Sequence, residues 1–179
     1  EAWDIKTGEP SLLIAIVDTG VDFDHPDLAG KVIPGRDFIN DDDLAQDDHG
    51  HGTFTAGIAS ALTDNNTGIA GTSWYGQILA VKVLDSSGSG THADVADGMI
   101  FAVDNGADVM NLSLGDSNPS TTLENAVKYA FDRGVVLVAA VGNDNGPVLF
   151  PAAYDDFVLG VAATDHNDER ASFSNFGPE

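Results

Sequence analysis

Positively charged residues are scarce in this chain of 179 residues. It has 7 lysines and arginines against 29 aspartates and glutamates, which gives a formal net charge of −22 at pH 7. Nucleic acids and anionic membranes bind positively charged protein surfaces, so we expect neither of them as a partner. A surface this acidic is typical of a soluble protein that binds cations or works in high salt.

The sequence also lacks cysteine and any long apolar run. Without cysteine no disulfide can form, and the redox compartment cannot be inferred from the sequence. No apolar run approaches the roughly 18 residues that a membrane-spanning helix needs. The chain opens on EAWDIKTGEP, which is not the basic start and apolar stretch of a signal peptide. We expect a single domain, with any targeting segment removed or outside this sequence.

Short apolar runs alternate with stretches of helical periodicity along the chain. The aliphatic run SLLIAIVD predicts a strand that is buried on both faces, and the small apolar residues of HGTFTAGIASAL predict a buried helix. The alternation predicts an α/β fold, with a mostly parallel sheet, helices on both faces, and functional residues at the carboxyl ends of the strands. The predicted strands are 11–18, 78–84, 107–115, 135–143 and 156–164, and the predicted helices are 51–62, 91–106 and 121–134.

Polar residues follow two of these strands and open one of the helices. Asp18 ends the first predicted strand, and Asn143 ends the fourth. The segment DDHGHGTFTAG, residues 47–57, places His49 and His51 beside two aspartates where a helix is predicted to start. Taken singly, Asp18 is as typical of a turn as of an active site, and Asn143 is more typical of a turn, so their combination carries the functional argument.

Two other enzyme classes compete for these residues. Asp18-Thr19-Gly20 also occurs in aspartic proteases, but they need two such aspartates and a strand-rich fold. A metal hydrolase would use His49 and His51 with Asp47 or Asp48. The two histidines are two positions apart, which places both on one face only in an extended segment. The remaining histidines are expected in a turn or at the surface: His25, His92 and His166.

Four motifs occur in a fixed order: IVDTGVDFDHPDL, DDHGHGTFTAGIAS, NLSLG and VAAVGNDN. In this order they resemble the subtilisin-like serine proteases, and thermitase-type members most closely, over nearly the whole chain. The resemblance implies a serine endopeptidase in which His51 takes the proton of the nucleophilic serine and Asp18 orients His51. It also implies that the side-chain amide of Asn143 stabilises the oxyanion.

The resemblance implies two edges of a substrate groove. Ser113, Leu114 and Gly115 match the segment that pairs with the substrate backbone, with Leu114 facing the first specificity pocket. Gly88, Ser89 and Gly90 match the opposite edge. A peptide held as an added strand is recognised mainly through its main chain, so we expect broad specificity. We expect Asp116 to alter the rim of the groove, and Asp144 to favour basic side chains.

The family's nucleophile motif, Gly-Thr-Ser-Met-Ala at the start of a helix, is not matched. The sequence GTS occurs at residues 71–73, but a strand follows it, so we interpret Ser73 as a loop residue. The resemblance therefore implies that residues 1–179 are a single incomplete catalytic domain, with the C-terminal part and its serine beyond Glu179. We expect this chain alone to be inactive. The alternative is a catalytically silent fragment or binding module of the same fold.

Two loops resemble calcium loops of the same family, and calcium prefers several oxygen ligands on a flexible loop. Without a bound ion, residues 37–48 would be a solvated acidic loop and residues 61–71 a turn that contains glycine. For the first loop the resemblance implies Asp37, Asp42, the Leu44 carbonyl and Gln46 as ligands. For the second it implies the side chains of Asp27 and Asn65 and the carbonyls of Leu62, Thr67 and Ile69.

The combined expectation is a secreted, calcium-binding endopeptidase. Its partners would be polypeptide substrates, the complementary C-terminal segment of the same protease, and a pro-peptide. Removal of the last helix and strands from such a domain should expose apolar surface, so we expect the chain alone to be marginally stable.

Overall fold

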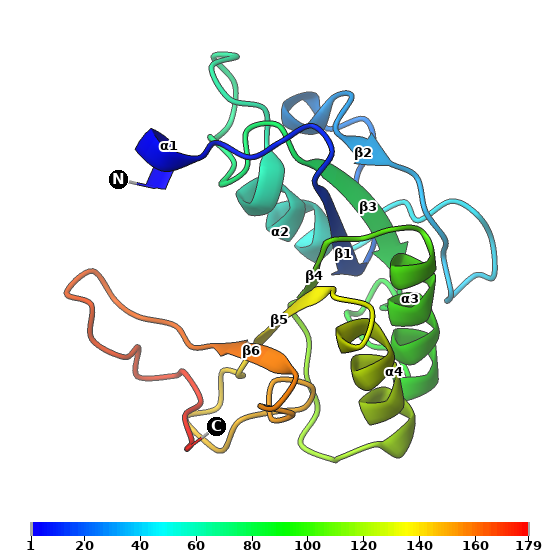
Figure 1. Cartoon of the computed structure of the whole chain (residues 1–179), viewed down its shortest axis with the longest axis vertical. Coiled ribbons are helices and arrows are strands. Elements are labelled where there is room, and N and C mark those ends of the chain that lie inside the picture. The colour runs from blue at the N-terminus through cyan, green and yellow to red at the C-terminus, as the bar shows by residue number, and fades with distance from the viewer. Residues whose placement is uncertain (1, 179) are drawn as a thin grey trace.

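The computed structural model describes residues 2–178 and has a parallel sheet at its centre (Figure 1). The strand order is β2-β3-β1-β4-β5-β6, and every neighbouring pair is parallel. The predicted α/β fold is confirmed. The strands are β1 (Leu13–Asp18), β2 (Val32–Ile33), β3 (Gln77–Lys82), β4 (Val109–Leu112), β5 (Val136–Ala140) and β6 (Val158–Val161).

The three predicted long helices are also present, and each ends earlier than the sequence pattern suggested. None of the helices within residues 2–178 is long and apolar enough to cross a membrane. Two short elements and the two-residue strand β2 were not predicted. The helical elements are α1 (Ala2–Ile5), the 3-10 helix η1 (Pro26–Leu28), α2 (His51–Ser60), α3 (His92–Asp104) and α4 (Thr121–Phe131).

Strand β1 lies at the point where the order of the strands reverses. It pairs with β3 on one side and with β4 on the other, and the chain then continues outward to β5 and β6. In parallel sheets the crevice beyond the carboxyl end of such a strand is the usual place for a binding site. Asp18 is the last residue of β1 and is fully buried, so it lies at this crevice.

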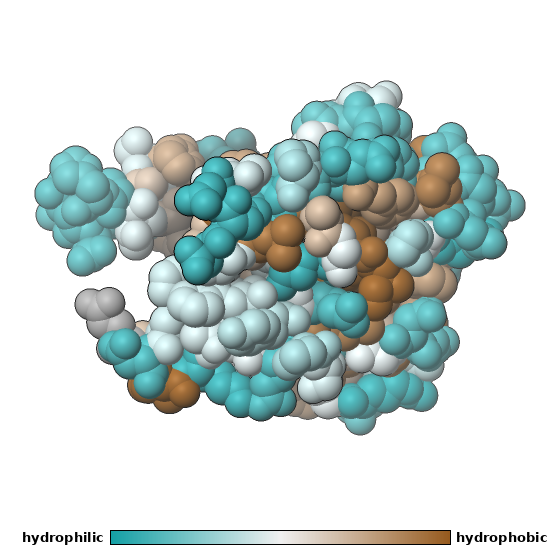
Figure 2. Space-filling view, turned by 90° about the horizontal axis from the view of Figure 1, so that it is seen from above, coloured by the Kyte–Doolittle hydropathy of each residue, from teal (hydrophilic) through white to brown (hydrophobic). Residues whose placement is uncertain are grey.

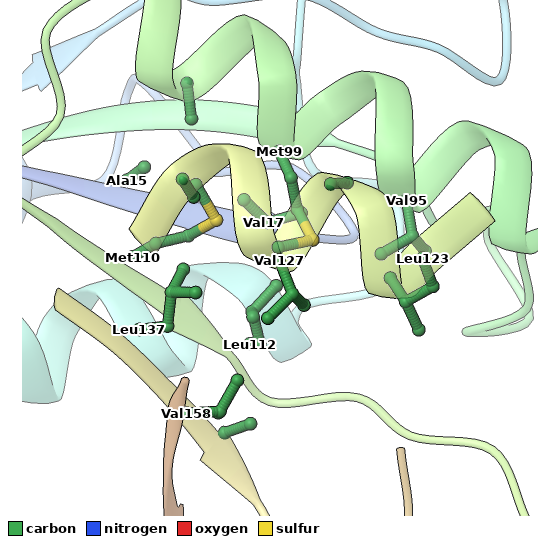
Figure 3. Packing of buried hydrophobic residues seen from close by; sticks show 14 of the residues in the cluster. Ala15, Val17, Val95, Met99, Met110, Leu112, Leu123, Val127, Leu137 and Val158 are labelled. Carbon is green, nitrogen blue, oxygen red and sulfur yellow. The ribbon is translucent and has the colours of Figure 1, made fainter. Parts of the chain in front are cut away.

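One face of the sheet packs against α3 and α4 and forms the main core (Figure 3). Met99 of α3 and Val127 of α4 are fully buried against Met110, Leu112 and Leu137 of the strands. Both helices begin with side-chain caps. The Thr91 hydroxyl accepts from the Asp94 amide, and the Ser120 hydroxyl accepts from the Leu123 amide.

Helix α2 covers the other face of the sheet only over β1 and β3. Ile14, Ile16 and Ile78 of the strands are buried there with Ala56 of α2. The outer residues of α2 are not covered, and Phe54 is 66% exposed. The prediction of a buried helix is therefore wrong, because nothing within residues 2–178 packs on this side of α2.

The same face of β5 and β6 is also open to solvent. Leu159 and Val161 of β6 are 61% and 52% exposed, although the alternate residue Val158 is buried on the α3–α4 face. A strand in a sheet covered on both faces would have both sets of side chains buried. The fold thus has a complete layer on one face and half a layer on the other.

Candidate active site

The side chains of Asp18 and His51 meet at the crevice beyond β1. Their approach joins the end of a buried strand to the first residue of α2, and His51 Nδ1 lies 2.7 Å from Asp18 Oδ1. An ionised carboxylate only accepts hydrogen bonds, so Nδ1 is the donor and the imidazole takes the tautomer with an unprotonated Nε2. The arrangement leaves His51 with a basic nitrogen that is free for proton transfer.

The Asp18 carboxylate is held in an enclosed position. Its side chain is fully buried, and Oδ1 also accepts a hydrogen bond of 2.7 Å from the Thr19 amide. Burial raises the pKa of Asp18, and the hydrogen bond from His51 opposes that rise. Oδ2 is buried and has no hydrogen-bond partner within residues 2–178. A buried acceptor of this kind strengthens the electrostatic interaction with an imidazolium at His51.

Asp47 fixes the start of α2, although the helix has no side chain cap at Gly50. Its Oδ1 accepts from the amides of His49 and Gly50 and from the Thr19 hydroxyl. Its Oδ2 accepts from the amide and the hydroxyl of Thr53. Burial alone would raise the pKa of Asp47, but the hydrogen bonds, led by the Thr53 hydroxyl, together lower it to about 2. Asp47 therefore holds His51 in place.

Lys82 adds a second connection behind the Asp18–His51 pair. Its side chain is 1% exposed, and Nζ donates to the carbonyls of Thr19 and Leu84, each at 2.8 Å. It also contacts Asp48 Oδ1 at 2.6 Å. The ammonium thus ties the end of β3 to the residue after Asp18 and to the loop before His51. Lys82 was not identified from the sequence, and Asp47 was named there only as a possible metal ligand, although an aspartate just before a helix is a known capping signal.

His51 opens onto a groove of about 500 Å³. The groove is lined on one side by the Gly88, Ser89 and Gly90 segment and on the other by Ser113, Leu114 and Gly115. The structure therefore brings together both segments that the sequence assigned to substrate binding. Other lining residues come from the ends of strands and from the first turns of α3 and α4.

The turn at residues 85–90 depends on its glycines. Gly88 has a φ of +76°, which disfavours other residues, and a Cβ on Gly90 would come within 2.1 Å of the Val83 carbonyl oxygen. Asp85 closes the turn, because its Oδ1 accepts from the amides of Ser87 and Ser89 and from the Ser87 hydroxyl. Hydrogen bonds to Asp85 thus form a turn at this edge of the groove.

Asn143 does not line this groove in the described part of the chain. Asn143 lies in the turn after β5 and is exposed. The turn itself is anchored by Asn175, which is 1% exposed. Asn175 Oδ1 accepts from the amides of Asp144 and Gly146, and Nδ2 donates to the Pro147 carbonyl. Asn175 was missed because its partners are about 30 residues away and no local pattern marks it.

The acidic loop of residues 37–48 only partly gathers its predicted calcium ligands. Asp37 and Asp42 exchange backbone hydrogen bonds, but both carboxyl oxygens of Asp37 already accept from residues 39 and 40. Gln46 Nε2 donates to Asp22, and the Leu44 carbonyl accepts from the Gln46 amide. Gln46 faces Asp22 in this arrangement, and calcium binding by this loop stays a prediction.

In the loop of residues 61–71, two residues of the predicted ligand set, Asn65 and Ile69, hydrogen-bond to a third, Asp27. It wraps around Asp27, which is 2% exposed and contacts Asn65 Nδ2 at 2.8 Å and the Ile69 amide at 2.9 Å. A Cβ on Gly68 would lie 2.1 Å from Asp27 Oδ2, so the loop backbone must pass very close to this carboxylate. A buried carboxylate, an amide side chain and loop carbonyls are the donor set that suits calcium.

The competing metal-hydrolase interpretation finds no support in the geometry. His49 and His51 have ring centroids 6.3 Å apart, and Asp47 is engaged by five donors. Within residues 2–178 no three histidine, aspartate or glutamate side chains are placed to hold one metal ion. The aspartic-protease interpretation needs a second buried Asp-Thr-Gly, which the sequence does not contain.

Among the histidines set aside from the sequence, His92 has a position that the sequence analysis did not specify. His25 caps η1 and His166 is exposed, as expected. His92, however, is the first residue of α3 and lines the groove, with its Nε2 4.0 Å from Asp116 Oδ2. The sequence pattern marked the start of a helix there but could not show that the helix opens onto the groove.

The family relationship agrees with this geometry. The model of the subtilase family matches residues 10–179, and the chain therefore belongs to the subtilase family. It is 53% identical over 177 residues to "Thermophilic serine proteinase" of Bacillus sp. (strain AK1), and the alignment covers 98% of this chain and 44% of that protein. It is 52% identical over 178 residues to "Thermitase" of Thermoactinomyces vulgaris, covering 99% and 63% respectively. It is 47% identical to "Halolysin" of Haloferax mediterranei, covering 99% and 35%. The chain thus spans about half the length of these relatives.

Proposed function

We propose that this chain forms the Asp–His part of the active site of a serine endopeptidase. The observation that carries the proposal is the 2.7 Å contact between a fully buried Asp18 and His51, at the mouth of a groove lined by both predicted substrate segments. Membership of the subtilase family supports serine protease activity for the whole protein.

In this proposal His51 acts as the general base. Asp18 keeps the proton on Nδ1, so Nε2 accepts the proton of a serine hydroxyl as it attacks the peptide carbonyl. His51 then returns the proton to the leaving amine, and Asp18 stabilises the imidazolium that forms in between. Asn143 would donate to the oxyanion. Asn143 lies outside the groove in this structure. For this role, contacts from a further segment would have to bring the turn of residues 142–147 to the groove.

The nucleophilic serine is proposed to lie in a segment beyond Glu179. Two observations support this. The family relatives are longer than this chain, and the open face of α2, β5 and β6 is an apolar surface that a further helix would cover. Of the partners expected from the sequence, the C-terminal segment is the one for which the open apolar face gives direct support. A pro-peptide remains part of the proposal only as an additional occupant of the groove.

The proposed substrate is an extended polypeptide lying between residues 88–90 and residues 113–115. Main-chain hydrogen bonds along such edges recognise any peptide, which supports broad specificity. The proposed location is outside the cell, consistent with the formal net charge of −22. Figure 2 shows hydrophilic residues, together with some apolar ones, on one face of the molecule.

Calcium is proposed most specifically for the loop of residues 61–71. Asp27, Asn65 and the carbonyls of Leu62, Thr67 and Ile69 would hold it, and the ion would cross-link this loop to η1. Calcium chloride should then raise the melting temperature of the protein, and Asp27→Asn should abolish that rise. An equal rise in both proteins would contradict the assignment.

The experiment that tests the proposed function is labelling with a fluorophosphonate, which reacts with serines activated by a histidine base. The full-length protein should take up one probe, and peptide mapping should place it on a serine outside residues 1–179. His51→Ala should abolish labelling because the serine then has no base.

The control is His166→Ala, since His166 is exposed and far along the sequence from the groove segments. This variant should label as the parent protein does. Absence of labelling in the folded parent protein would contradict the proposal and favour a catalytically silent binding module. Labelling of Ser73 would contradict the placement of the nucleophile.

A further inference from the structure

A loop near the end of the chain is paired with the turn that carries Asn143. Backbone hydrogen bonds of 2.7–3.0 Å join the turn of residues 142–146 to the loop of residues 173–176, on both sides of Asn143. The turn and the loop therefore form one hydrogen-bonded unit. These bonds run, from amide to carbonyl, from Asn175 to Gly142, from Phe176 to Gly146 and from Asn145 to Phe173.

The side chain of Asn175 lies against the inside of this turn and is bonded only to it. Asn175 is 1% exposed. Its Oδ1 accepts from the amides of Asp144 and Gly146 at 2.8 and 2.9 Å, and its Nδ2 donates to the Pro147 carbonyl at 2.8 Å. The loss of such a side chain leaves buried polar groups unpaired, so these bonds hold the turn in one arrangement.

Gly142 lets the backbone approach this side chain closely. Its φ is +110°, and a Cβ at this position would lie 2.4 Å from Asn175 Nδ2. A larger residue would push the Asn175 side chain away from the turn. The conformation of residue 142, directly before Asn143, is therefore tied to the position of Asn175.

The side chain of Asn143 takes no part in this network. It is exposed and makes no hydrogen bond within residues 2–178. The backbone is thus held on both sides of Asn143, while the side-chain amide stays free to donate. A donor for an oxyanion needs this combination, because a preorganised donor stabilises the developing charge without reorganising during the reaction.

We propose that Asn175 is a positioning residue for the oxyanion donor: it fixes the turn of residues 142–147, and the turn sets the direction of the Asn143 amide. This inference rests on the proposed function, because Asn143 must act on a peptide carbonyl. Asn175 does not line the groove, so it acts through Asn143. A further segment that brings the turn to the groove would carry the paired loop with it.

The test is a double-mutant cycle in the full-length protein, with kcat and KM measured on one extended peptide. Fluorophosphonate labelling to completion gives the concentration of active protein, so unfolded molecules are not counted. Asn175→Ala should lower kcat by about ten- to hundredfold, since displacement of a catalytic group by about 1 Å costs on that order. KM should change by less than about threefold, because Asn175 makes no contact with the substrate.

The second background separates positioning from general support of the site. Asn143→Ala removes the donor, so adding Asn175→Ala should lower kcat by less than about threefold more. There is then no donor left to misplace. A residue that supported the whole site would instead lower kcat equally in both backgrounds.

Ser60→Ala is the control for lost stability. Ser60 is fully buried, and its hydroxyl accepts from Lys31 and lies 2.6 Å from the Gly76 carbonyl oxygen, outside the turn and its loop. This variant should lower the melting temperature and keep kcat within about twofold. A loss of kcat as large as that of Asn175→Ala would show that stability alone explains both effects, and would overturn the inference.

A second variant covers the case in which Asn175→Ala does not fold. Asn175→Asp keeps an acceptor for the amides of Asp144 and Gly146 and loses only the donor to the Pro147 carbonyl. It replaces Asn175→Ala in the same cycle. Its loss of kcat should likewise be present with Asn143 and largely absent in Asn143→Ala.

The outcomes separate the two proposals. An unchanged kcat in the Asn175 variants, or an equal loss in both backgrounds, overturns the positioning role and leaves the endopeptidase. Failure of the parent protein to cleave any peptide contradicts the endopeptidase, and the positioning role falls with it.

Discussion

The two halves of the sheet differ on the face that carries α2. Around β1 and β3 the layer is complete: Ile16 and Ile78 are buried, and Asp47 and Lys82 tie the strand ends to the loop before His51. Around β5 and β6 the same face is open, with Leu159 and Val161 exposed. The complete half holds Asp18 and His51 in contact, whereas the open half leaves Asn143 outside the groove.

This difference shows that the contact between Asp18 and His51 does not depend on the open half. Asp18 and His51 are placed by hydrogen bonds within residues 18–84, so their geometry forms without any further segment. The turn that carries Asn143 is held mainly by Asn175, from one side. We infer that the missing layer completes the oxyanion side of the site and the stability of β6.

The largest expected effect comes from Phe54 on the outer side of α2. If a further segment covers this helix, Phe54→Ala should lower the free energy of unfolding of the full-length protein by about 3–5 kcal/mol, as for a buried phenylalanine. Ile33→Ala, at the opposite edge of the sheet, should lower it by less than about 1 kcal/mol. Urea denaturation measures both. A Phe54 effect as small as that of Ile33 would mean that α2 stays open.

A smaller effect is expected from Lys82 in the complete half. Lys82→Met removes a buried donor and leaves the Thr19 and Leu84 carbonyls unpaired. The expected loss is about 1–3 kcal/mol of unfolding free energy, with lower activity because the Asp18–Thr19 backbone loses its support. Lys128→Met is the matched control, since Lys128 is partly exposed and its pair with Glu124 lies within one helix. Its cost should stay below about 0.5 kcal/mol. Equal losses in both variants would contradict the role given to Lys82.

The smallest effect concerns pH and Asp47. Its folded pKa of about 2 is below the ordinary value of 3.8, so its contribution to stability is present above pH 4 and is lost as the pH falls toward 2. The expected contribution is about 1–2 kcal/mol, after allowance for solvent screening. Denaturation midpoints between pH 5 and 2 should show a smaller decline in Asp47→Asn than in the parent protein. Parallel declines would show that other carboxylates control acid stability.

The sequence was sufficient to predict the strands, the long helices and their arrangement in layers. It did not show which faces of these elements are covered. The aliphatic run of β1 and the helical periods of α3 and α4 predicted buried elements because those patterns are local. The same reasoning made α2 a buried helix, since small apolar residues surround it on all sides. Whether Phe54 is covered depends on a contact with another part of the protein, and no local pattern contains that information.

The candidate site divides in the same way. The motifs around Asp18 and His51 predicted their pairing, and the segments at residues 88–90 and 113–115 were found together at the groove. The positions of His92 and Asn175 in the structure were not predicted. His92 faces Asp116, 24 residues away, and Asn175 bonds to residues about 30 positions away, so no local pattern marks either contact. The hydrogen bond from Gln46 Nε2 to Asp22 was not part of the calcium prediction for residues 37–48, because only the folded loop reveals it.

The most direct test of the half-complete layer is hydrogen–deuterium exchange, measured by mass spectrometry on this chain and on the full-length protein. The account predicts that the amides of β6 and α2 exchange much more slowly in the full-length protein, while those of β1 and β3 change little. Equal exchange of β6 and α2 in the two proteins would contradict the claim that a further segment covers this face and brings the nucleophile to His51.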